Sequence, residues 1–215
     1  MKSLSFGLIA VAAVAASGCT PDWARQNDSG YIIEIASIQG GTAGGSSGQG
    51  GEIRSDVITR GSVFNDDAIV TVNLIRKNNS PGLSVSPIEH AYLDSYEVVY
   101  FRTDGRNTEG VDVPFRITGP LGNLRFHTPA GGGGEVEQNV NITIVRHAAK
   151  LEPPLSDLRN ILTAQPLDPT APFQVPGQGI ITTVAEITIH GHTIQGDGLE
   201  ATGRVQVSFA DFADQ

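Results

Sequence analysis

The chain has 215 residues, a net charge of −9 from 14 basic and 23 acidic side chains, and a single cysteine. This acidic balance argues against a nucleic-acid partner, because such binding depends on Lys and Arg contacts to phosphates, and one cysteine excludes an intramolecular disulfide. The length suffices for a sizeable hydrophobic core, and 26 glycines with 12 prolines indicate the many turns of a β-rich protein.

The first residues have the layout of a secretory signal peptide. Lys2 precedes an apolar stretch over 4–16, which is too short to span a bilayer because a spanning helix needs ~20 such residues. Small residues at 16–18 lead to Cys19. The segment resembles the lipobox of bacterial lipoproteins, with alanine at position 16 where leucine is most common, and the resemblance covers residues 1–19 alone.

The resemblance implies that residues 1–18 are removed and that Cys19 becomes the lipidated first residue of the mature chain. Stable anchoring needs more than one hydrophobic chain, and a diacylglycerol on sulfur with an N-acyl chain would supply it. Thr20 stands where aspartate tends to retain such proteins at the inner membrane of Gram-negative cells, which favours the outer membrane. Residues 19–30 are then a polar tether to a single β-domain over 31–215. The alternative is an ordinary signal peptide with a chance cysteine.

Most of the remaining chain has the pattern of β-strands. Apolar and polar residues alternate in several segments, as they do in a strand with one buried face. The predicted strands are 31–38, 52–59, 68–77, 91–102, 111–117, 135–147, 180–192 and 199–212. The residues predicted to share one face of 91–102 are Tyr92, Tyr96, Val98 and Tyr100. The predicted core includes Val70, Leu74, Val98, Ile142, Ile144, Val205 and Val207.

Turns and one exception complete the pattern. Asp197 and Gly198, between the last two strands, are a strong hairpin signal, and Pro114 places 111–117 at a sheet edge. Apolar residues spaced as in a helix over 152–164 predict one short helix. The sequence therefore predicts an all-β protein, an antiparallel immunoglobulin-like β-sandwich with one short helix, with a jelly roll or an open barrel as alternatives.

Two histidines are the candidate metal ligands. His190 and His192 lie two apart on a predicted strand and so share a face, which would let both rings reach one Zn²⁺. Glu186 lies on that face but too far along the strand to complete the site, so further ligands would come from elsewhere, such as His90, His127 or His147. The competing interpretation is a solvent-facing polar stripe, and it is favoured because no metal-ligand signature accompanies the pair.

Other motifs have a simpler explanation as loops. The Gly-x-Ser-x-Gly match at 44–48 lies in a glycine tract rather than at a strand-to-helix turn, which makes it a chance match to the hydrolase motif. The segments 65–67, 103–107 and 196–198 offer oxygen ligands for Ca²⁺, but turn formation is sufficient to explain them. The glycines at 131–134 lack the lysine and helix of a phosphate-binding loop.

The sequence favours a non-catalytic, lipid-anchored protein of the cell envelope. It would contact the membrane through the lipid on Cys19 and bind or scaffold an envelope protein or polysaccharide, and no cofactor is implied. A Ca²⁺-, Zn²⁺- or carbohydrate-binding module is the alternative. An enzyme acting on envelope polymers is less favoured, because the linear sequence groups no nucleophile, acid and base.

Overall fold

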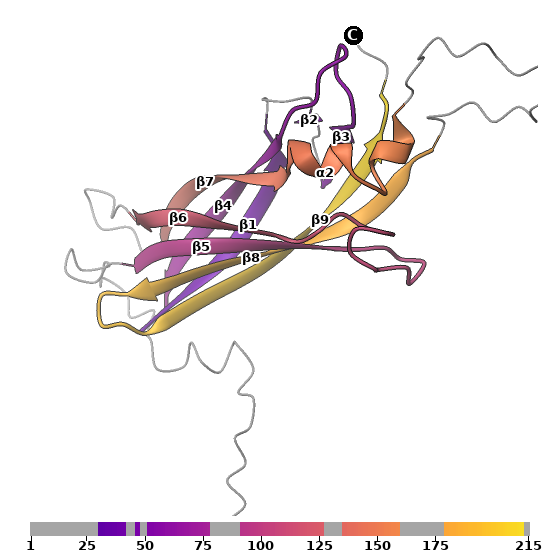
Figure 1. Cartoon of the computed structure of the whole chain (residues 1–215). Helices are drawn as coiled ribbons and strands as arrows, with labels where there is room; N and C mark the ends of the chain where they lie inside the picture. The colour runs from indigo at the N-terminus through magenta and orange to yellow at the C-terminus, as the bar shows by residue number, and fades with distance from the viewer. Residues whose placement is uncertain are drawn as a thin grey trace, which may run out of the picture.

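The computed structural model describes residues 30–41, 46–47, 51–77, 91–126, 135–159 and 179–212. Nearly all of its regular structure is β (Figure 1). The strands are β1 (Tyr31–Gly40), β2 (Ser46–Ser47), β3 (Glu52–Asp56), β4 (Asp66–Arg76), β5 (Ala91–Phe101), β6 (Ile117–Arg125), β7 (Glu135–Val145), β8 (Ile181–Thr193) and β9 (Gly198–Ala210). One short helix, α2 (His147–Leu151), and a 3-10 turn, η1 (Ser156–Leu158), follow β7.

The strands form two sheets that enclose one core. The smaller sheet has the order β1-β4-β7 and the larger the order β2-β3-β9-β8-β5-β6. The larger sheet is curled, and the smaller lies behind it in Figure 1. The all-β prediction is confirmed, whereas this arrangement does not confirm an immunoglobulin-like sandwich. The prediction of antiparallel strands is wrong for one pair, because β3 runs parallel to β9. Side-chain alternation within one strand does not specify the direction of its partner.

The core lies between the inner faces of the two sheets. All seven residues predicted for it are buried, and none exposes more than 4% of its surface. Strand β8 shows the cause most clearly, because Ala185, Ile187 and Ile189 are wholly buried while the residues between them are partly exposed. The two-residue period therefore located the buried face correctly in these strands.

The edge strand β6 differs from the sequence prediction. Residues 111–116 form a loop, and the strand is Ile117–Arg125, which contains Gly119 and Pro120. Those residues disfavour strands in general, but β6 is the last strand of its sheet, where a missing backbone N–H is tolerated. The Tyr96 ring lies so close over Gly119 that a side chain there would overlap it. An aromatic ring from β5 thus covers the glycine in β6.

The helix also lies elsewhere than predicted. The α-helix occupies His147–Leu151, and within the predicted segment 152–164 the described part holds the 3-10 turn at Ser156–Leu158. Two consecutive prolines at 153 and 154 interrupt the helix, since proline lacks the N–H that a helix interior needs. The helical spacing did identify two buried leucines, Leu155 and Leu158. Residues 160–164 are outside the described part of the chain.

Candidate functional site

The outer face of the larger sheet carries the two candidate histidines. His190 and His192 point away from the core, as the alternation of β8 predicts, and their side chains are 41% and 40% exposed. Each is next to a carboxylate from a neighbouring strand. His192 Nδ1 lies 2.8 Å from Asp94 Oδ2 on β5, and His190 Nδ1 lies 3.3 Å from Glu200 Oε2 on β9.

A β-bulge in β5 brings Asp94 to this face. Against β8, Leu93 pairs with Gly191 and Ser95 with the next residue, His190, so Asp94 is an extra residue without an opposite partner. The register against β6 is also irregular at this point. Bulges of this kind redirect side chains. The predicted shared face of Tyr92 with Tyr96, Val98 and Tyr100 is therefore wrong for Tyr92, because the inserted residue reverses the alternation before it. Tyr96 and Tyr100 are buried, whereas Tyr92 is on the outer face.

The Tyr92 ring, on the outer face, contacts His192. It stacks on the His192 ring with a centroid distance of 5.3 Å and an interplanar angle of 21°. His192 thus contacts a carboxylate through its Nδ1 atom and an aromatic ring on its face. Tyr92, Asp94 and His192 form a preorganised polar cluster, which we call the outer cluster.

The glycine between the histidines is explained by the same bulge. Gly191 faces the core opposite Leu93, and a Cβ there would overlap the backbone carbonyl oxygen of Tyr92. A backbone atom cannot move aside as a flexible side chain can. In the sequence His-Gly-His, His192 therefore pairs with Asp94, and Gly191 leaves the space that the bulge needs.

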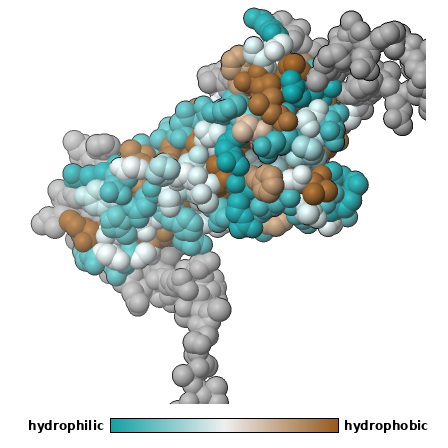
Figure 2. Space-filling view, in the orientation of Figure 1, coloured by the Kyte–Doolittle hydropathy of each residue, from teal (hydrophilic) through white to brown (hydrophobic). Residues whose placement is uncertain are grey.

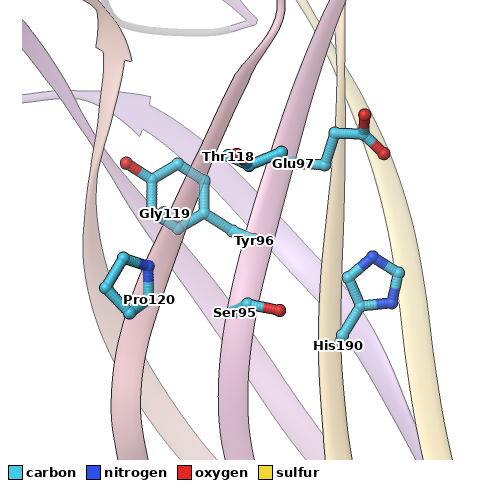
Figure 3. A pocket seen from close by; sticks show the side chains of 7 residues that line it. All are labelled: Ser95, Tyr96, Glu97, Thr118, Gly119, Pro120 and His190. Atoms are coloured by element: carbon cyan, nitrogen blue, oxygen red, sulfur yellow. The ribbon is translucent and has the colours of Figure 1, made fainter.

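A shallow pocket adjoins the outer cluster. It has a volume of about 400 Å³ and opens among strands β5, β6 and β8 (Figure 3). Its lining residues are Ser95, Tyr96, Glu97, Thr118, Gly119, Pro120 and His190. The Ser95 hydroxyl and the His190 ring are directed toward the same side of the sheet, while Glu97 is paired with Arg116 at 3.4 Å. The pocket offers hydroxyl, imidazole and carboxylate groups for hydrogen bonds to a polar ligand.

Cross-strand polar pairs continue beside the pocket. Thr188 and Thr202 hydroxyls lie 3.2 Å apart, and Arg204 binds Glu186 at 2.6 Å. These exposed pairs are individually worth little to stability. Together they make the outer face of this sheet a polar surface (Figure 2 shows one side of the molecule, with mostly hydrophilic residues).

The loops proposed as Ca²⁺ ligands already have partners within the protein. Asn65 Oδ1 accepts a hydrogen bond from the backbone of His147, and the Asp104 carboxylate binds Arg102 and Arg106 at 2.6 and 2.9 Å. The two guanidinium groups hold the pKa of Asp104 well below its usual range. The Thr193 hydroxyl donates to Asp197 within the β8–β9 turn. These contacts are those of turn and loop formation.

The other candidate metal ligands do not join His190 and His192 in the described part of the chain. The described residues contain no group of three or more His, Cys, Asp or Glu arranged to hold a metal ion, and no helix among them is long and apolar enough to cross a membrane. His147 begins α2 and contacts Asn65, whereas His190 and His192 lie on β8 of the larger sheet. Cys19, His90, His127, most of 44–48 and the glycines at 131–134 lie outside the described residues.

The structure contains a buried ion pair that the sequence does not indicate. Lys150 of α2 and Asp66 of β4 are both wholly buried, with Nζ 2.8 Å from Oδ1, and Nζ also donates to the Asp56 carbonyl oxygen at 2.7 Å. Burial raises the pKa of Asp66 to about 6, against the lowering effect of Lys150. Nothing in the pattern around Lys150 distinguishes it from a surface lysine. Asp66 belongs to the segment 65–67, for which turn formation is a sufficient explanation from the sequence.

Comparisons with known proteins add no family. No family model matches the chain, and neither does any curated protein. Among solved structures, the chain is similar to Northeast Structural Genomics Consortium target SoR45 at 9% identity and a TM-score of 0.33, over 84% of this chain and 87% of that one. It is also similar to a Bordetella pertussis protein assigned as ApaA, at 8% identity and a TM-score of 0.30, over 84% and 92% of the two chains. Similarities this low assign neither a fold family nor a function.

Proposed function

We propose that this chain is a lipid-anchored protein of the bacterial cell envelope whose β-domain binds or scaffolds another envelope component. The observation that carries the proposal is the single cysteine, Cys19, placed directly after a short apolar stretch and three small residues. Thr20 favours the outer membrane in a Gram-negative cell. An immunoglobulin-like sandwich is part of the proposal, supported by two sheets that share one core.

The anchoring is tested by replacing Cys19 with Ser. Cells producing each form are labelled with a clickable fatty acid, and membranes are separated from soluble material. The unaltered protein should carry the label and sediment with membranes, because the thioether needs the cysteine sulfur. The Cys19→Ser form should lose both properties. Equal labelling of the two forms would contradict the lipoprotein assignment.

The partner that the outer face favours is a polysaccharide. The Tyr92 ring stacks on His192, and the strands β5 and β8 that carry these two residues also line a pocket with hydroxyl, imidazole and carboxylate groups. Aromatic rings together with hydrogen-bonding groups suit the apolar ring faces and the hydroxyls of sugars. Binding of the purified protein to isolated cell-wall polysaccharide tests this. Tyr92→Ala should weaken that binding, and Phe64→Ala, at an exposed aromatic residue outside this sheet, is the matched control. Equal binding by both variants would exclude the Tyr92 face.

A further inference from the structure

Asp66 and Lys150 form an unusual pair within the core. Both side chains have no solvent exposure, and 84 residues of sequence separate them. Asp66 begins β4 in the smaller sheet, and Lys150 is the fourth residue of α2, which follows β7. Lysine is almost never fully buried unless it is paired. This pair therefore joins two parts of the chain at a place where water is excluded.

The pair is incompletely satisfied as a salt bridge. Lys150 Nζ makes two hydrogen bonds, to Asp66 Oδ1 and to the Asp56 carbonyl oxygen. Ser55 lies next to the Asp66 carboxyl, yet neither Ser55 Oγ nor Asp66 Oδ2 makes a well-formed hydrogen bond to the described residues. A buried ion pair repays its desolvation only when the remaining lone pairs and protons are satisfied. Loss of both charges would remove that cost.

We propose that Lys150 and Asp66 condense to an intramolecular isopeptide bond that ties β4 to α2. The Lys150 side chain is the nucleophile, and the Asp66 carboxyl is the acyl group. The bond would be a modification of the folded core, independent of the lipid on Cys19. In a chain that has no second cysteine, it would supply the covalent tie that a disulfide provides in other extracytoplasmic proteins.

The reaction balances without an oxidant or a co-reactant. One proton passes from the Lys150 ammonium to the Asp66 carboxylate along their hydrogen bond, which leaves an amine and a carboxylic acid. The amine lone pair attacks Cγ and forms the C–N bond. The C–O bond to one carboxyl oxygen then breaks, and this oxygen leaves as water with one proton from the amine and the proton of the acid. The product is one secondary amide and one water molecule.

The geometry places the reacting atoms close together. Nζ is 2.8 Å from Oδ1, and a C–O bond adds at most about 1.2 Å, so Nζ lies within ~4 Å of Cγ. Reacting atoms in well-oriented sites are about 3–3.5 Å apart before reaction, so a small side-chain rotation suffices. Burial raises the pKa of the Asp66 carboxyl, which favours the acid form that the step needs.

Peptide mapping of the full-length protein tests the bond. The protein is purified from membranes, denatured and digested with trypsin, which does not cleave after an acylated lysine. The expected product is a single branched species, residues 61–76 joined to residues 147–159, lighter than the two separate peptides by one water molecule. Fragment spectra should place the link on Asp66 rather than on Asp67. Free peptides 147–150 and 151–159 with no branched species would overturn the proposal.

Three variants control for chance linkage. Lys150→Arg and Asp66→Ala should each abolish the branched species, because one removes the amine and the other the carboxyl. Asp67→Asn should keep it, since the adjacent Asp67 carboxylate binds Thr143 and not Lys150. A branched species that persists in Asp66→Ala would also overturn the proposal. The result for the unaltered chain decides the matter even if a variant does not fold.

Discussion

Two acid–base pairs in this molecule have the same separation but different surroundings. In the outer cluster, His192 lies 2.8 Å from Asp94, and the two side chains are 40% and 35% exposed. In the core, Lys150 lies 2.8 Å from Asp66, and neither side chain is exposed at all. The distance between the partners is therefore no guide to how much each pair matters to the fold. The solvent around them decides it.

The difference follows from the dielectric response of water. Water screens an exposed pair and can replace either partner, so breaking the pair costs little. A buried charge left without its partner has no such substitute, and the cost is several kcal/mol. The exposed His192–Asp94 pair, the outer pair, can thus exchange a contact for a ligand at little cost. The buried Lys150–Asp66 pair, the inner pair, is needed for the stability of the fold.

The largest expected effect comes from removing one member of the inner pair. Lys150→Met leaves the Asp66 carboxyl buried without its partner, and this should lower the free energy of unfolding by about 3–5 kcal/mol. The same direction holds whether the two residues form an ion pair or the proposed amide. Denaturant unfolding followed by circular dichroism measures the change. The double variant Lys150→Met/Asp66→Leu should recover a large part of the loss, and a single variant as stable as the unaltered chain would show that the pair is not committed to the fold.

The second effect is a pH dependence that belongs to Asp66. Burial raises its folded pKa to about 6, and its unfolded value is near 3.8, so the folded state binds more protons between these values. In any form whose Asp66 carboxyl is free, stability should then fall as pH rises from about 4 to about 6, by roughly 3 kcal/mol for a shift of this size. Lys150→Met cannot form the amide and has lost the ammonium that lowers this pKa, so this form should show the dependence at least as strongly. Unfolding measured from pH 4 to pH 7 checks it.

Formation of the amide should make the unaltered chain and Lys150→Met differ in their pH dependence. An acylated Asp66 does not titrate, so the unaltered chain should lack the slope that Lys150→Met shows. A flat pH profile in Lys150→Met would show that Asp66 is not the buried acid described above. The two profiles together separate a covalent tie from an ion pair.

The inner and outer pairs also differ in what the sequence could predict. Alternation within β8 located His190 and His192 on the outer face, because a strand buried on one side must place every second residue there. The same rule failed for Tyr92. The bulge at Asp94 depends on the fit of β5 against two neighbouring strands, and no period within β5 encodes that fit.

Contacts between distant parts of the chain could not be predicted from local sequence patterns. Lys150 in α2 reads as a surface lysine, and only the packing of the helix against the core reveals its contact with Asp66. Similarly, β6 contains Gly119 and Pro120, which local propensity counts against a strand, and its place at the sheet edge permits it. The core residues were predictable because burial repeats along a strand. The pairings were not, because they depend on tertiary packing.

A third, smaller effect tests the bulge that creates the outer cluster. Gly191→Ala would drive a methyl group into the Tyr92 carbonyl oxygen, and overpacking of this kind costs about 1–3 kcal/mol. The His192 ring signals should shift as well, because Asp94 and Tyr92 move with the bulge. Gly198→Ala is the matched control, since it lies opposite His192 in β9 and has open space around it. Equal stability and spectra for the two variants would rule out steric dependence on Gly191.

The smallest expected effect concerns the histidines themselves. Both rings are half-exposed on the outer face, while Ala185, Ile187 and Ile189 fill the core side of the same strand. Replacing both His190 and His192 with glutamine should therefore change the free energy of unfolding by less than about 0.5 kcal/mol, as at other surface positions. A structural metal would give a different result, because removing its ligands removes folding free energy. Thermal unfolding of both forms, with and without a chelator, distinguishes the two. A large loss in the double variant, reproduced by chelator on the unaltered chain, would make the outer cluster a metal site and reverse the contrast with the inner pair.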